Sequence, residues 1–415
     1  MWRETIRLQT PPSTAEGTAL EPGNHHLVHK ASDEPKPIVA VVRDCFCHIS
    51  EGFVYRHVVG LKRYHPVVLA RRRMNSDLFP YHDVVLAEPS SWLPARAAYY
   101  LLRAGSHSLD RPYVHVSHHF SRFLSTRRPA LIHAHFGWSA AAVLHLAKKH
   151  RVPMVFTAHG SDVNSLSSGG RWYPRQLAEC LAVADKVLCV SQFIANRVRQ
   201  LGCPDDKIRV LRLGVPIPPL PQRRVAEEVR FIAVGRLTPV KGPLFTLRAF
   251  RLVHEKLPQA RLCLIGDGPL MGDVRTFLNE SGLADAVRVL GQASHARVYQ
   301  EMAQSDVFVQ HSVRTPDGQE EGFPLTFAEA AAHGLPSVGT RSGGTPEAVL
   351  DGVTGFLVPE RDVDAMARKM LALATDAKLR SQMGAAGRAY VVENCDLEKQ
   401  NASLEGLYDE IRASV

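Results

Sequence analysis

The sequence predicts an α/β protein made of two doubly wound parallel-sheet (Rossmann-like) domains that face a central cleft. Three observations lead to this prediction. Short, continuously apolar runs alternate with helical patterns along most of the chain, as expected of parallel strands that are buried on both faces. The alternation stops once, at a proline-rich stretch, and then resumes. The length of 415 residues is also enough for two or three domains.

Residues 1–36 are rich in Pro, Ser, Thr, Glu and His and show no apolar periodicity. We expect a disordered tail there, because little apolar surface is available to offset the entropy of ordering. The first ten residues lack the apolar centre of a secretory signal. No run approaches 18 apolar residues, and the seven cysteines form no C-x-x-C pair. These features favour a cytoplasmic location.

The first folded domain is expected over residues 37–215. Its strand-type runs are Ile38–Val42, Val67–Ala70, Val84–Ala87, Ala130–His133, Met154–Thr157, Val187–Val190 and Ile208–Leu211. Helical patterns lie between several of them, for instance over Ser139–Lys149 and Gln192–Leu201. Strands and helices that alternate in this way indicate a parallel sheet that is covered on both faces.

A linker is expected over residues 216–228, because four prolines within residues 216–221 can neither continue a helix nor lie in a central strand. The second domain follows over residues 229–395, with a helical stripe at Pro243–Leu257. Its strand-type runs are Phe231–Val234, Leu262–Ile265, Val287–Leu290, Val307–Gln310 and Ser337–Thr340. Residues 396–415 are expected to form a terminal helix, for which the first domain is a candidate packing surface.

Ligands of doubly wound sheets bind beyond the carboxyl ends of the strands, so the loops that follow the strands are informative. Gly235–Gly242 carries Arg236 and Lys241 ahead of a helix, a combination suited to a diphosphate. Taken alone, it is equally consistent with a plain turn bearing two surface cations. Gly268, after the next strand, would allow a close approach of the backbone or only a tight turn.

The segment EEGFPLTFAEA contains the strongest pattern. Pro324 fits the first turn of a helix, and Gly334 fits its end. The backbone N–H groups of Leu325 and Thr326 would then face an anion.

Glu321 precedes this helix and Glu329 lies inside it. Carboxylates repel phosphate but accept hydrogen bonds from sugar hydroxyls. An anion site with a carboxylate on either side describes a nucleotide sugar, with one Glu on the transferred sugar and one on the ribose. The alternative is a solvated acidic helix, against which the apolar neighbours such as Phe323 argue.

In the first domain, Gly52 follows the first strand, and His159 and Asp162 follow another strand. His159 with Asp162 is a candidate for chemistry in the cleft. His133 and His135 point to the same face of a strand. They could be ligands of a metal-dependent hydrolase or hydrogen-bonded structural residues, and no further ligand set is evident.

The chain carries 50 basic and 41 acidic residues, a net charge of +9. The first domain holds much of the excess, with Arg71, Arg72 and Arg73 in a row and Trp92, Tyr99, Tyr100 and Tyr113 nearby. This composition suits an anionic membrane surface or an anionic acceptor, or simply a solvated face. No nucleic-acid-binding signature is present, so no nucleic-acid partner is expected.

Taken together, these segments resemble the retaining glycosyltransferases of the GT-B fold, family 4. The resemblance covers roughly residues 38–412. Its motifs in the second domain are VGRLTPVKG, LIGDGP, LGQ, the E-x7-E pair and RSGGTPEAVLDGVTGFLV, and those in the first are IHAHFG, TAHGSD and VSQFI. The block HSVRTPDGQEEGFPLTFAEAAAHGLP further resembles exopolysaccharide glycosyltransferases of the colanic-acid and amylovoran kind.

The resemblance implies specific roles for the residues named above. Arg236 and Lys241 would bind the donor diphosphate, Glu321 the donor sugar and Glu329 the ribose, while His159 would contact the sugar near the reacting centre. The catalytic set is then His159, Arg236, Lys241 and Glu321. The donor-binding set is Gly52, Gly268, Phe323, Pro324, Leu325, Thr326 and Glu329. Asp162 is assigned to the acceptor.

The sequence therefore predicts transfer of a hexose from a nucleoside diphosphate sugar to a hydroxyl of a glycan or lipid-linked oligosaccharide, with retention at the anomeric carbon. The resemblance implies front-face attack, and no motif requires a metal or cofactor. The expected partners are the nucleotide-sugar donor, a glycan or polyprenyl-linked acceptor and an anionic membrane surface. The alternatives are a nucleotide-sugar epimerase, a metal-dependent hydrolase and a binding protein without turnover.

Overall fold

The computed structural model describes residues 35–87, 114–166, 173–220 and 228–414. Residues Lys36–Val415 form one compact unit. The predicted disordered tail lies almost entirely outside the described residues, as do residues 221–227 of the predicted linker. The four aromatic residues that the sequence places in the basic region of the first domain also lie outside them.

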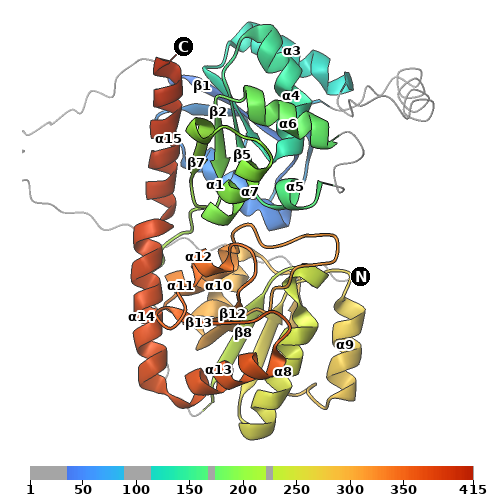
Figure 1. The fold of residues 1–415 in the computed structure, drawn as a ribbon, viewed down its shortest axis with the longest axis vertical. Coiled ribbons are helices and arrows are strands. Elements are labelled where there is room, and N and C mark those ends of the chain that lie inside the picture. The colour runs from blue at the N-terminus through green and yellow to red at the C-terminus, as the bar shows by residue number, and fades with distance from the viewer. Residues whose placement is uncertain (1–34, 88–113, 167–172, 221–227, 415) are drawn as a thin grey trace, which may run out of the picture. The chain divides into compact units, whose positions relative to one another are not determined.

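The predicted fold class is confirmed, because the described chain forms two parallel sheets (Figure 1). The first sheet has the strand order β3-β2-β1-β4-β5-β6-β7, and all of its strand pairs are parallel. Its strands are β1 (Ile38–Phe46), β2 (His65–Arg73), β3 (Val84–Leu86), β4 (Leu131–His135), β5 (Met154–Ala158), β6 (Lys186–Cys189) and β7 (Ile208–Val210). Each overlaps a run predicted from the sequence.

Helices cover both faces of the first sheet. They are α1 (Gly52–Gly60), α3 (Val114–Arg127), α4 (Gly137–His150), α5 (Ser161–Asn164), α6 (Tyr173–Val183) and α7 (Gln192–Gln200). Alternate strand residues such as Val42 and Phe156 pack with apolar residues of α3, α4, α6 and α7. Val39 and Val41 point to the other face, where α1 packs. This alternation explains why the strands read as continuously apolar.

The second sheet has the strand order β10-β9-β8-β11-β12-β13 and is also entirely parallel. Its strands are β8 (Arg230–Val234), β9 (Arg261–Ile265), β10 (Val287–Gly291), β11 (Val307–Val309), β12 (Ser337–Thr340) and β13 (Gly355–Val358). The sequence did not predict β13. This strand has only four residues and begins at Gly355. A Cβ added at Gly355 would lie 2.2 Å from the Ser337 carbonyl oxygen.

The helices of the second domain are α8 (Pro243–Lys256), α9 (Met271–Glu280), α10 (His295–Ala303), α11 (Leu325–Ala332), α12 (Thr345–Ala348), α13 (Val363–Thr375) and α14 (Ala377–Asn394). Phe231 and Leu264 pack with α8, α9 and α13 on one face. Ile232 and Phe308 pack with α10 and α11 on the other. Among the described residues, no helix combines the length and apolar character needed to cross a membrane.

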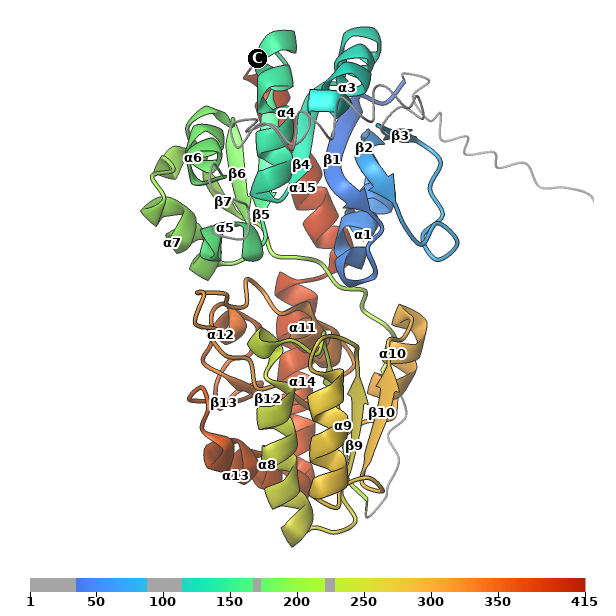
Figure 2. The same ribbon diagram turned by 90° about the vertical axis from the view of Figure 1, so that its right-hand side faces the viewer.

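The last helix, α15 (Leu397–Ala413), packs on the first sheet, not the second. Leu404, Leu407, Tyr408 and Ile411 share an apolar core with Val39. Figure 2 shows α15 and α4 on opposite sides of the first sheet. The chain enters and leaves the second domain side by side, since Val215 bridges Asp396 in parallel.

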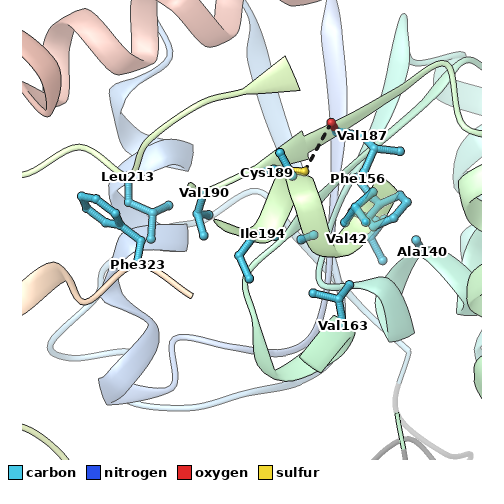
Figure 3. Packing of buried hydrophobic residues seen from close by; sticks show 14 of the residues in the cluster. Val42, Ala140, Phe156, Val163, Val187, Cys189, Val190, Ile194, Leu213 and Phe323 are labelled. Carbon is cyan, nitrogen blue, oxygen red and sulfur yellow. Dashed lines mark hydrogen bonds between the residues drawn. The ribbon is translucent and has the colours of Figure 1, made fainter. Parts of the chain in front are cut away.

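The apolar core continues from the first domain into the second. Val190, Ile194 and Leu213 belong to the same buried cluster as Phe323, which comes from the loop before α11 (Figure 3). Phe323 is 6% exposed. This contact fixes the loop that carries Glu321 against the carboxyl end of β6.

Candidate functional site

Lys241 and Glu321 lie together beyond the carboxyl end of the second sheet. Lys241 Nζ is 2.6 Å from Glu321 Oε1, and both side chains are largely buried. The same Oε1 accepts hydrogen bonds of 3.1 Å from Gln310 Nε2 and from Ser312 Oγ. The described residues form no hydrogen bond with Glu321 Oε2. This oxygen is also absent from the fully buried side-chain atoms that have no hydrogen-bond partner. Three donors therefore anchor one oxygen and leave the other open.

Gln310 connects this pair to the start of α11. Its Nε2 also donates to Ser312 Oγ over 2.7 Å, and its Oε1 accepts a hydrogen bond from Thr326 Oγ1 over 3.4 Å. Pro324 occupies the N-cap position, one residue earlier than the first-turn position predicted, and offers no side-chain cap. The N–H groups of Leu325 and Thr326 therefore have no partner within the helix and are available to an anion.

The loops after β8 and β9 touch through their backbones. A Cβ on Gly268 would lie 2.6 Å from the Leu237 carbonyl oxygen, and Gly268 has a φ of +158°. Leu237 N donates to the Asp267 carbonyl oxygen over 2.9 Å. Only glycine fits this approach, which fixes the loop that carries Arg236. Arg236 itself is exposed, and the described residues form no recorded hydrogen bond or ion pair with it.

Glu329 lies in a second polar cluster, formed across the two domains. Its Oε1 accepts hydrogen bonds from Arg56 Nη1 and Nη2, both 3.1 Å, and from Tyr299 Oη, 3.0 Å. Arg56 lies on α1 of the first domain and Tyr299 on α10 of the second. The Glu329 side chain is only 6% exposed, and Arg56 neutralises its charge.

Gly52 begins α1 and approaches the second domain closely. A Cβ there would lie 2.7 Å from His295 Nε2. Arg56, one turn further along α1, places its Nη2 3.0 Å from His295 Nδ1. A guanidinium can only donate, so His295 Nδ1 is the acceptor and the ring is neutral. Burial, followed by the charge of Arg56, lowers the pKa of His295.

His159 follows β5 and stacks among aromatic rings. Its ring centroid is 4.3 Å from that of Phe136 and 4.8 Å from that of Phe53. Its Nε2 is 3.1 Å from His135 Nδ1. Burial holds the pKa of His159 well below its usual range, so the ring is neutral. Its backbone carbonyl oxygen faces Gly322, where an added Cβ would lie only 1.9 Å away.

Asp162 is fully buried and organises backbone. Its carboxylate accepts hydrogen bonds from the N–H groups of Gly137, His159 and Gly160 over 2.8–3.0 Å. This arrangement favours a role in holding the His159 loop over the acceptor contact predicted from the sequence. Burial raises the pKa of Asp162, and the bonds from these N–H groups act in the opposite direction.

His133, one of the two ligands considered for the metal-hydrolase alternative, already has hydrogen-bond partners in the first domain. His133 Nδ1 is 2.5 Å from Tyr408 Oη, and Nε2 is 2.8 Å from Thr157 Oγ1, so both ring nitrogens are engaged. Burial, then the neighbouring His57, lowers the pKa of His133 to about 3. Within the described ranges, no group of three His, Cys, Asp or Glu residues could hold a metal ion.

The structure thus brings Lys241, Glu321 and Thr326 into one network, while Glu329 belongs to another. Gln310, Ser312, Arg56, Tyr299 and His295 were missed from the sequence. Gln310 and Ser312 carried a usable signal, because they directly follow β11 at the edge where ligands bind. Arg56 carried none, because an arginine on an amphipathic helix does not reveal what it packs against.

One hollow of the second domain lies away from these residues. It has a volume of about 300 Å³ and is lined by Arg230 and Arg261, the first residues of β8 and β9, together with Arg288 and Glu301. It therefore opens at the amino ends of the strands. None of the predicted site residues lines it.

Two family models match the chain. The one described as Glycosyltransferase Family 4 matches residues 53–217, and the one described as Glycosyl transferases group 1 matches residues 221–390. These matches cover the first and the second domain in turn.

Curated relatives match about three-fifths of the chain. A putative colanic acid biosynthesis glycosyltransferase of Escherichia coli is 32% identical over 246 residues, which are 58% of this chain and 60% of the relative. The chain thus spans about three-fifths of the length of that relative. A GDP-mannose-dependent phosphatidylinositol monomannoside mannosyltransferase of Mycobacterium tuberculosis is 32% identical over 270 residues, with 61% of this chain and 69% of the relative covered.

Solved structures share the fold. The Anabaena protein HepE, crystallised with UDP and glucose, superposes with a TM-score of 0.74 at 18% sequence identity. The superposition covers 90% of this chain and all of HepE.

Proposed function

Since the chain belongs to the GT-B glycosyltransferases of family 4, we propose that it transfers a hexose from a nucleoside diphosphate sugar to a hydroxyl of a glycan or lipid-linked oligosaccharide, with retention at the anomeric carbon. The observation that carries the proposal is the cluster of Lys241 and Glu321 beside the open N-terminus of α11. It offers a cation and N–H groups to phosphate and a carboxylate to a sugar, all from loops at one edge of the sheet.

The donor diphosphate would bind between Lys241 and the Leu325 and Thr326 N–H groups. Lys241 would turn from Glu321 toward the phosphate, while Gln310 and Ser312 keep the carboxylate in place for a sugar hydroxyl. Arg236, which is exposed on the neighbouring loop, would add a second cation. Each such preorganised donor typically contributes about 2.7–4 kcal/mol to stabilising charge in the transition state.

In the proposed reaction, the acceptor oxygen forms a bond to the anomeric carbon as the bond from that carbon to the diphosphate oxygen breaks. The acceptor proton passes to the departing diphosphate, on the same face of the sugar. His159, being neutral, would hold the sugar by a hydrogen bond and would not act as an acid. The Asp162 carboxylate, which accepts hydrogen bonds from the His159 and Gly160 N–H groups, keeps the His159 loop in position. Retention is checked from the anomeric proton coupling of the first product.

The named relatives support a role in glycan biosynthesis. The E. coli relative is assigned to colanic acid biosynthesis and the mycobacterial one to a phosphatidylinositol mannoside. A polyprenyl- or lipid-linked acceptor would bring the enzyme to an anionic membrane. Of the three consecutive arginines, Arg71 pairs with Asp44 and Arg73 bonds the Phe79 carbonyl oxygen, which leaves Arg72 exposed.

Thermal unfolding with a panel of UDP-, GDP- and ADP-linked hexoses tests the donor class. A bound donor raises the midpoint with the logarithm of its concentration. The proposal is contradicted if no nucleotide sugar of the panel shifts the midpoint.

The positive groups described above serve the diphosphate without a metal, so turnover should persist after dialysis against EDTA. The epimerase alternative predicts conversion of the donor sugar in the absence of any acceptor.

A further inference from the structure

Glu329 is anchored through one oxygen only. Oε1 takes both hydrogen bonds from Arg56 and the one from Tyr299. The described residues give Oε2 no recorded partner, and Oε2 is not a buried unpaired atom. An arginine that simply neutralises a carboxylate commonly engages both oxygens in a two-pronged pair. The arrangement here leaves Oε2 without a hydrogen bond to the described residues.

We infer that Arg56 of the first domain positions Glu329 of the second domain to receive the ribose hydroxyls of the donor at Oε2. The inference rests on the proposed function. It makes Arg56 a positioning residue, because it acts through Glu329 and does not itself contact the donor. Ribose recognition then depends on a residue of the domain assigned to the acceptor.

Arg56 is itself held firmly, which favours positioning. Its Nη2 contacts Tyr299 Oη and His295 Nδ1, each at 3.0 Å, in addition to Glu329. Its side chain is only 12% exposed. Tyr299 bonds both Arg56 and Glu329, so the three groups form a closed triangle. If Arg56 had to move away from Glu329 before the donor bound, it would lose all of these contacts.

Glu321 shows the same arrangement within the second domain. Lys241, Gln310 and Ser312 all meet its Oε1, and its Oε2 is left open. The two carboxylates of the E-x7-E pair thus each meet three donors at one oxygen, and Gln310 and Ser312 remain on Glu321 when Lys241 turns to the diphosphate in the proposed function. The parallel supports Arg56 and Tyr299 as the fixing groups of Glu329.

The test measures how strongly the protein distinguishes ribose from a ribose without hydroxyls. UDP, GDP and their 2′,3′-dideoxy analogues are titrated calorimetrically into the wild-type chain. Whichever of UDP and GDP binds more tightly is then used, together with its dideoxy analogue, for the variants. A hydrogen bond to a charged group predicts that the wild type binds the ribonucleotide about 10- to 100-fold more tightly than the analogue. Glu329→Gln should reduce this ratio strongly.

Arg56→Met should reduce the ratio to about 3-fold or less, by weakening the ribonucleotide while the affinity for the dideoxy analogue stays unchanged. Arg56→Lys should give an intermediate ratio, since an ammonium keeps the charge but not the paired N–H geometry. Glu347→Gln is the matched control. Glu347 receives the Gln192 and Phe193 N–H groups of the first domain, so it also links the domains, and its substitution should leave the ratio unchanged.

An unchanged ratio in Arg56→Met overturns the inference, as does tighter binding of the ribonucleotide, which would make Arg56 a competitor. If Glu329→Gln loses the ratio and Arg56→Met keeps it, the inference alone fails. If the wild type binds neither UDP nor GDP, or binds the ribonucleotide and its dideoxy analogue equally tightly, the ribose role of Glu329 fails and the inference fails with it. Thermal unfolding without ligand shows whether Arg56→Met folds. If Arg56→Met does not fold, the affinity ratio of Arg56→Lys tests the inference, and a ratio equal to that of the wild type overturns it.

Discussion

Lys241 is the residue whose charge is most directly tied to the proposed chemistry. It lies at the end of the short turn before α8 and meets Glu321 at 2.6 Å. Removing the ammonium would leave Glu321 with Gln310 and Ser312 as hydrogen-bond donors, so the local fold has other supports. A defect in the variant would then report on the diphosphate and not on folding.

Lys241→Ala should lower kcat by about 100- to 1000-fold, because one preorganised group that stabilises the leaving diphosphate is lost. The thermal midpoint of the unliganded protein should change little. Lys256→Ala is the control, since Lys256 is an exposed lysine at the end of α8. Turnover in Lys241→Ala equal to that of the control would remove the proposed role.

The sequence pointed to some of the residues that meet in the candidate site and missed others for a physical reason. Lys241, Glu321 and Thr326 follow successive strands or open a helix, and the carboxyl ends of parallel strands share one edge. Their convergence follows from topology. Arg56 and Tyr299 lie within helices of different domains, and the docking of those helices is set by side-chain packing. Periodicity shows that such a helix has a buried face but not which partner covers it.

At the level of elements, the packing of α14 on α11 depends on the absence of a side chain. A Cβ at Gly384 in α14 would lie 2.2 Å from the carbonyl oxygen of Gly334, just after α11. Gly406 in α15 meets no atom within 4 Å. The two positions are both helical glycines and differ in their surroundings.

Gly384→Ala should destabilise the protein by about 1–3 kcal/mol, because the methyl group overpacks a close backbone contact. Gly406→Ala should stabilise it by about 0.5–1 kcal/mol, since alanine favours the helix and nothing obstructs it. Urea unfolding of the two variants gives both values. Equal effects of the same sign would show that helix propensity, and not the contact, governs Gly384.

Elements were predicted where burial leaves a pattern. The strands of the first sheet overlap apolar runs, because both faces of that sheet are covered. The helix Pro243–Leu257 was predicted from its apolar stripe, and α8 ends one residue earlier. Gly355–Val358 escaped prediction because four residues that start with glycine give neither length nor alternation. Its pairing with β12 arises from tertiary structure.

For the molecule as a whole, buried histidines make stability depend on pH. Burial, followed by the charge of Arg56, lowers the pKa of His57 to about 4, and burial lowers that of His133 to about 3. In the unfolded chain both would titrate near 6.5. The unfolded state therefore binds protons that the native state does not, and stability falls as the pH drops from about 6.5 toward 4.

Urea titrations at pH 7, 6 and 5 should show this loss, with each such group contributing up to about 1.4 kcal/mol per pH unit. His57→Phe should flatten the dependence, since one of the groups is removed. His82→Phe, which replaces an exposed histidine, should not. Equal pH dependence in both variants would contradict the contribution assigned to His57.

The position of α15 has a consequence for how the protein is made. A ribosome releases residues 36–215 long before residues 404–411. Yet Leu404, Tyr408 and Ile411 fill the same apolar layer as Val39 and Tyr64. During translation one face of the first sheet is therefore covered only by α1, without α15, while the second domain emerges and folds. The nascent chain would expose that layer to chaperones until the final helix arrives.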